Sequence, residues 1–159
     1  MRLAFVIFAL ALLLGCGPAA TPAGQDVLVA NVEEDLTPEQ RKALVGALHM
    51  PVAAITFPDG QGSVEVEVIA ARGATRDGNG MTVDLQREPA FLRSIRVRVK
   101  DAAGYQITAQ VVGNPVNVGT AESPIHARLV QITRKKSGLF GSSMAQTSFR
   151  ATPRGVERL

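Results

Sequence analysis

The sequence predicts a mainly β protein, a single antiparallel β-sandwich or meander with one short N-terminal helix. Apolar and polar residues alternate over several runs, which is the pattern of strands with one buried face. Gly, Pro, Asp and Asn separate these runs in combinations typical of turns. No helical segments connect the runs, so a parallel sheet with helical crossovers is disfavoured.

The first element is a short apolar segment at residues 3–14. It follows Arg2, offers 12 apolar residues and ends at Gly15, whereas a helix that spans a bilayer needs about 20. A positive start, a short apolar run and small residues at its end are the layout of a secretory signal. Residues 1–15 are therefore expected to be a cleaved signal peptide.

The single cysteine of the chain stands directly after this segment. Leu13-Leu14-Gly15-Cys16 resembles the lipobox of bacterial lipoproteins, a resemblance confined to the first 16 residues. It implies cleavage between Gly15 and Cys16 and attachment of acyl chains such as palmitate to Cys16. Gly17 in place of Asp implies the periplasmic face of the outer membrane, or the cell membrane in a Gram-positive host. The alternatives are a plain signal peptide with an incidental cysteine and an uncleaved anchor helix.

The mature chain divides into two parts. Residues 16–25 are mostly small residues and prolines, which predicts a flexible tether. Residues 26–159 suit one domain, expected to be a periplasmic β-rich domain. With Cys16 acylated, this domain has no disulfide and must be stable through packing alone.

The one predicted helix begins with a capping pattern. Thr37 is a suitable N-cap, Pro38 suits the first helical position, and Gln40 stands three residues after the cap. An apolar stripe continues to Leu48, and Pro51 ends the element.

Strands follow the helix. Six to eight short strands are expected, the clearest at Ser63–Ala70, Ser94–Lys100, Tyr105–Val111 and Ile125–Lys136. Gly113-Asn114-Pro115 is expected to form a turn.

No catalytic site, metal site or cofactor is predicted. Asp77, Asn79 and Glu88 match three positions of a calcium loop, but Met81 and Thr82 stand where that loop needs a ligand and a glycine. A hairpin turn is the better interpretation of this window. The only two histidines are expected to be structural, and no Gly-x-Ser-x-Gly motif is present.

Charge is distributed unevenly along the chain. Residues 16–92 carry 5 Lys or Arg and 11 Asp or Glu, a net charge of −6, whereas residues 93–159 carry 11 and 3, a net charge of +8. Two interpretations stay open. Arg96 and Arg98 either contact an anionic partner or lie beside the acidic strand that contains Glu65 and Glu67.

A second candidate contact lies at Lys135, Lys136, Leu139 and Phe140. Glycines bracket the two apolar residues, so the segment is expected to be the tip of a hairpin. Leu139 and Phe140 either fold back onto the core or insert into a partner or lipid surface beside the lysines.

The expected function is that of a membrane-anchored periplasmic lipoprotein with a non-catalytic binding or assembly role in the cell envelope. A protein of a secretion, pilus or outer-membrane complex is the expected partner. The alternatives are an enzyme acting on envelope material and a phage- or plasmid-encoded lysis or exclusion lipoprotein. Nucleic acid is not expected as a partner, because the expected location is periplasmic and aromatic residues for base stacking are scarce.

Overall fold

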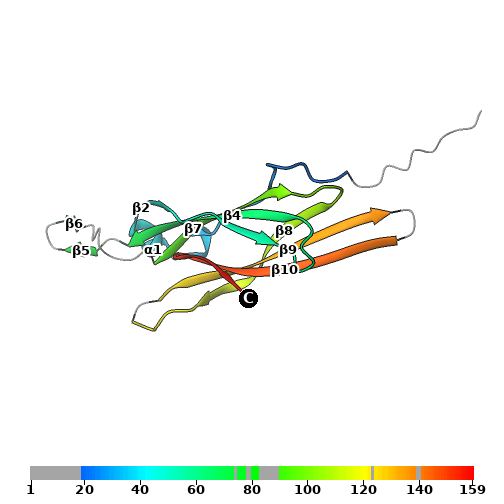
Figure 1. The fold of residues 1–159 in the computed structure, drawn as a ribbon. Helices are drawn as coiled ribbons and strands as arrows, with labels where there is room; N and C mark the ends of the chain where they lie inside the picture. The colour runs from blue at the N-terminus through cyan, green and yellow to red at the C-terminus, as the bar shows by residue number, and fades with distance from the viewer. Residues whose placement is uncertain (1–18, 74, 78–79, 83–89, 123, 139–140) are drawn as a thin grey trace, which may run out of the picture.

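The computed structural model describes residues 19–73, 75–77, 80–82, 90–122, 124–138 and 141–159. Two antiparallel sheets pack face to face in an elongated sandwich (Figure 1). The elements, in chain order, are β1 (Asp26–Asn31), a 3-10 turn (Glu33–Asp35), α1 (Pro38–Lys42), β2 (Leu44–His49), β3 (Ala53–Thr56), β4 (Ser63–Gly73), β5 (Thr75–Asp77), β6 (Gly80–Thr82), β7 (Phe91–Asp101), β8 (Gln106–Asn117), β9 (His126–Gly138), β10 (Gly141–Thr152) and β11 (Gly155–Arg158).

The predicted mainly β, antiparallel architecture is confirmed. The first sheet has the order β1-β7-β4-β2, with β3 also paired to β4, and the second has the order β11-β10-β9-β8. The chain passes from the first sheet to the second at the β7–β8 connection, so consecutive halves of the chain build the two sheets. β5 and β6 form a separate hairpin at one end of the molecule, as expected for that window (Figure 1).

The core lies between the two sheets. Alternate residues of each long strand point inward, because successive side chains in a strand point to opposite faces. The predicted apolar faces of β4 and β7 are buried, and each of these side chains contributes about 1.5–3 kcal/mol. The first sheet supplies Val64, Val66, Val68, Ile95, Val97 and Val99, and the second supplies Ile107, Val130, Ile132, Phe149 and Ala151.

The predicted N-terminal helix is not confirmed beyond a single turn. Thr37 does cap that turn, because its Oγ1 accepts the amide of Gln40 at 3.2 Å and its own amide donates to Oε1 of Gln40 at 2.8 Å. However, α1 ends at Lys42, and Leu44–His49 forms β2 against β4. A five-residue helix has little stability of its own, and pairing with an open strand edge overrides the helical pattern.

The turn predicted at Gly113-Asn114-Pro115 does not form either. These residues lie inside β8, whose register against β9 shifts between Val112 and Val116. Such a bulge keeps the strand continuous while it adds residues to one side. β8 is an edge strand, and an edge tolerates a proline that cannot donate a hydrogen bond.

The chain joins the sandwich before β1 begins. The Thr21 amide donates to the carbonyl oxygen of Tyr105 at 2.9 Å, and the Ile107 amide donates to Oγ1 of Thr21, also at 2.9 Å. The Gly24 amide donates to the carbonyl oxygen of Val99 at 2.6 Å. The part of the expected tether from Thr21 onward is therefore hydrogen-bonded to both sheets.

Candidate functional site

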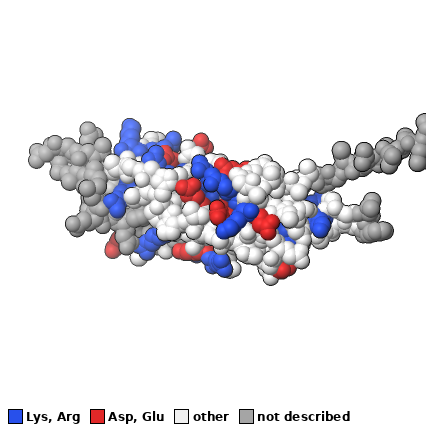
Figure 2. Space-filling model, turned by 45° about the horizontal axis from the view of Figure 1, so that its top comes forward, with Lys and Arg blue, Asp and Glu red and all other residues white. Residues whose placement is uncertain are grey.

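A network of charged side chains crosses the outer face of the first sheet (Figure 2). Strand register sets Glu65 opposite Arg98 and Glu67 opposite Arg96. Nη1 of Arg96 donates to Oε2 of Glu67 at 3.3 Å, and Nε of Arg98 donates to Oδ1 of Asp26 at 3.1 Å. Basic β7 thus lies between acidic residues of β4 and β1.

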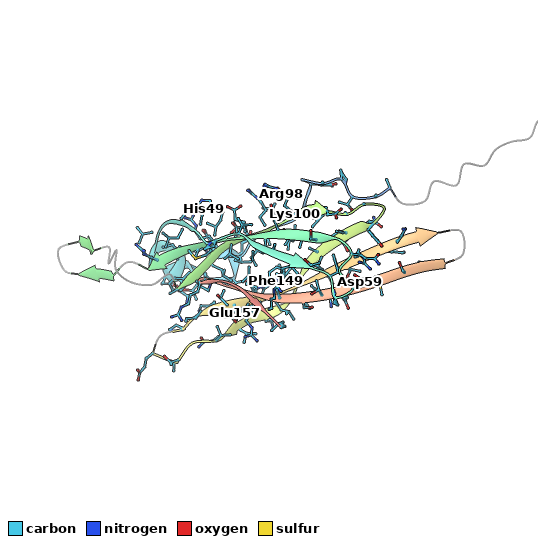
Figure 3. The ribbon with its side chains drawn as sticks, in the orientation of Figure 1. His49, Asp59, Arg98, Lys100, Phe149 and Glu157 are labelled. Carbon is cyan, nitrogen blue, oxygen red and sulfur yellow. The ribbon has the colours of Figure 1, made fainter. Side chains whose placement is uncertain are left out.

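Two further residues extend this network (Figure 3). Nζ of Lys100 lies 3.3 Å from Oε1 of Glu65. Nδ1 of His49 lies 2.8 Å from Oε1 of Glu67. His49 therefore lies on β2 beside the acidic strand.

Arg96 and Arg98 therefore have carboxylate neighbours within their own sheet. Their side chains are 38% and 44% exposed, and exposed ion pairs contribute only about 0.2–1 kcal/mol each. The charge asymmetry along the sequence is partly compensated in space, because β7 belongs to the otherwise acidic sheet. A partner role for these two arginines stays a prediction, and such a partner must compete with Asp26 and Glu67.

The second predicted contact lies on the β9–β10 hairpin. The two strands pair as far as Gly138 opposite Gly141, which confirms the hairpin. Lys135 and Lys136 are exposed near its end. Nζ of Lys136 lies 5.2 Å from the centre of the Tyr105 ring, close enough for a cation–π contact. Leu139 and Phe140, at the expected tip, lie outside the described residues.

A buried arginine joins the two sheets, and the sequence analysis did not identify it. Arg134 on β9 is only 4% exposed. Its Nη1 donates to Oδ1 of Asp59 at 2.7 Å, its Nη2 donates to Oδ2, and Nη1 also donates to the carbonyl oxygen of Gln61. The guanidinium carbon lies 4.4 Å from the centre of the Tyr105 ring and 5.1 Å from that of Phe57.

This pair changes the titration of both groups. The hydrogen bond from Arg134, with a second from the Gln61 amide, holds the pKa of the Asp59 carboxyl below its ordinary value of 3.8. The hydrogen bond to Asp59 in turn raises the pKa of Arg134. A signal for this residue exists in the sequence, since Arg134 continues the inward-facing positions of Val130 and Ile132.

The comparisons with known proteins add no relative: no family model, no curated protein and no solved structure matches the chain. The site is therefore assigned from its own chemistry.

Neither a cluster of metal ligands nor a membrane-spanning helix occurs in the part of the chain that the structure describes. No group of three or more His, Cys, Asp or Glu there is placed to hold a metal ion. The calcium-like window at residues 77–88 falls largely outside the described residues. No helix among the described residues is long and apolar enough to cross a membrane.

A shallow groove of about 410 Å³ lies where the N-terminal segment meets β8. Its walls come from residues 19–22 and 25–27 on one side and 106–108 on the other. Thr21 and Ile107 form part of this lining and also make the hydrogen bond described above. The groove marks the place where the chain enters the sandwich.

Proposed function

We propose that this chain is a bacterial lipoprotein, anchored through acylated Cys16, whose β-sandwich has a non-catalytic binding or assembly role in the cell envelope. The observation that carries the proposal is the position of the one cysteine, directly after a 12-residue apolar run and within Leu-Leu-Gly-Cys. Two or three acyl chains anchor a protein far more firmly than a single chain, whose binding is marginal. Gly17 after the cysteine supports the periplasmic face of the outer membrane.

The way in which the chain enters the domain supports a role close to the membrane. Thr21 is hydrogen-bonded to β8 and stands five positions after Cys16. At no more than about 3.6 Å per residue, these five steps span at most about 18 Å. The acylated residue and the sandwich are thus held within a short reach of each other.

The sandwich supplies surfaces suited to a binding role. Its core is formed by packing between two sheets, and its outer face carries paired charges on β1, β4 and β7. A partner with complementary charges can exchange with these pairs, because exposed ion pairs are weak. We propose an envelope protein as that partner.

Metabolic labelling tests the anchor. The full chain, expressed in a Gram-negative host, should incorporate a palmitate analogue and sediment with outer membranes, and Cys16→Ser should abolish both. The matched variant Gly17→Asp should keep the label but move to the inner membrane. Equal labelling of the Cys16→Ser variant and the natural chain would overturn the proposal.

Crosslinking in cells tests the binding role. A photo-reactive amino acid at Val29 or at Asn31, both exposed on β1 beside β7, should give a discrete crosslinked species that contains one envelope protein. The same label at buried Val130 serves as the control. Failure of every exposed strand position to crosslink would contradict a binding role.

A further inference from the structure

The β9–β10 hairpin projects beyond the rest of the second sheet. β8 pairs with β9 only as far as Gln106 opposite Lys135. β9 and β10 continue for three more residue pairs, which end at Gly138 opposite Gly141. At about 3.3 Å per residue, this two-stranded extension is about 10 Å long.

The extension and the residue that precedes it on β9 are cationic. Residues 123–156 contain no Asp or Glu. The arginines of β9 and β10 each have an acidic neighbour on another element, in the pairs Arg128–Asp35, Arg134–Asp59 and Arg150–Glu157. Lys135 and Lys136 differ, because no carboxylate among the described residues lies within ion-pair distance of either.

The side chains of the two lysines point to opposite faces of the β9–β10 ribbon. Arg134 points into the sandwich, so Lys135 points to the outer face and Lys136 to the inner one. Lys136 nevertheless remains exposed, because it stands beyond the end of the core and lies over the Tyr105 ring. The charge is therefore presented at the end of the ribbon rather than on one sheet face.

This end of the molecule is also where the chain enters it. Thr21 donates to the carbonyl oxygen of Tyr105, the residue whose ring contacts Lys136. Figure 1 shows the first described residues at the same end as the projecting part of β9 and β10. A membrane anchor five residues before Thr21 would hold this end nearest to the bilayer.

We propose that Lys135 and Lys136 contact anionic lipid headgroups of the membrane that holds the anchor, and so orient the sandwich with its β9–β10 end toward the bilayer. This inference rests on the proposed acylation of Cys16. Attraction between a lysine and an anionic surface is lost beyond about 8–10 Å, so the short span to Thr21 is what makes contact possible. Each lysine in contact is expected to favour this orientation about fivefold.

Carboxylates also stand at this end, where Asp59 is paired with Arg134 and Asp101 is exposed. Asp101 closes β7, and its Oδ1 accepts the amide of Ala103 at 3.2 Å. Arg134 balances the charge of Asp59, so the two lysines outnumber Asp101, the other carboxylate named here. An Asp101→Asn exchange, which retains an acceptor for Ala103, should strengthen the contact.

Fluorescence quenching by headgroup-labelled lipid tests the orientation. The acylated full chain carries a fluorophore on Ser142→Cys in the extension or on Glu39→Cys in α1, at the other end of the sandwich (Figure 1). The vesicles contain phosphatidylcholine with about one third phosphatidylglycerol and a trace of nitroxide-headgroup lipid. We expect at least twofold more quenching at position 142 than at position 39.

Charge reversal tests the lysines themselves. Lys135→Glu with Lys136→Glu should reduce the quenching at position 142 to the level at position 39, as should vesicles of phosphatidylcholine alone. The matched pair Arg41→Glu with Lys42→Glu makes the same change of charge on exposed residues of α1 and should leave quenching unchanged.

The outcomes separate the two proposals. Absence of palmitate label or of vesicle association overturns the anchor, whatever the lysines do. Normal acylation with equal quenching at both positions, or with no effect of lysine reversal, overturns the orientation alone. If the reversal instead abolishes binding to isolated cell-wall polymer while quenching is unchanged, the lysines contact that polymer and not lipid.

Discussion

Arg134 on β9 donates to both carboxylate oxygens of Asp59, which lies in the β3–β4 connection, and this pair fastens one sheet to the other. The partners differ in burial: the arginine side chain is 4% exposed and the aspartate side chain 42%.

Replacement of Asp59 and replacement of Arg134 should therefore lower the free energy of unfolding by different amounts. Asp59→Asn leaves a buried guanidinium without its counter-charge, whereas Arg134→Met leaves a carboxylate that water can reach. We expect Asp59→Asn to lower the free energy of unfolding more than Arg134→Met, as measured by urea denaturation. Equal losses would show that burial of the arginine is not the controlling factor.

Stability should fall in acid partly through the same pair. The folded-state pKa of Asp59 lies below its ordinary value of 3.8, so near this pH the folded state binds fewer protons than the unfolded chain. The contribution is fully present well above pH 3.8 and is lost as pH falls through the lower, folded-state pKa. Urea midpoints measured between pH 7 and pH 2.5 should decline more for the natural chain than for Arg134→Met. Parallel curves would argue against this linkage.

The hydroxyl of Thr21 should hold the N-terminal segment on β8. Thr21→Val keeps the shape but removes the acceptor for the Ile107 amide, and should reduce the free energy of unfolding by about 0.5–1.5 kcal/mol. Hydrogen exchange at the Ile107 amide should accelerate in the same variant. Thr21→Ser, which retains the hydroxyl, is the control and should behave nearly as the natural chain does.

Reversal of Arg96 and Arg98 should destabilise the first sheet. With both changed to Glu, their side chains face Asp26 and Glu67, so about 0.5–2 kcal/mol of stability should be lost. The loss should shrink in high salt, because exposed charges are screened. If the arginines instead serve a partner, the melting temperature will hardly change while partner crosslinking falls.

The buried strand faces could be predicted from sequence because a period of two leaves little ambiguity. Val64, Val66 and Val68 have a simple alternation with glutamate, and all three are fully buried. The predicted length of the helix was wrong for a physical reason. The cap at Thr37 is a local interaction that sequence displays, whereas the pairing of Leu44–His49 with β4 depends on a strand that lies later in the chain.

The site was harder to predict than the fold. Register between β4 and β7 decides that Arg96 meets Glu67, and no local pattern states which strands are neighbours. Arg134 violated the apolar pattern of β9 at an inward position. That violation is a usable signal, but its partner Asp59 is 75 residues away in the sequence.

The division of the chain into consecutive sheets has a consequence for the order of folding. The first sheet is complete in sequence by Asp101, before any strand of the second has been made. It can form its ladder of hydrogen bonds at that stage, but the valines of β4 and β7 still face water until β8 to β11 arrive. Without residues 106–158 this half of the molecule is a sheet with one uncovered apolar face, and such surfaces are prone to self-association. Packing against residues 106–158 covers this face and so removes the surface that favours self-association.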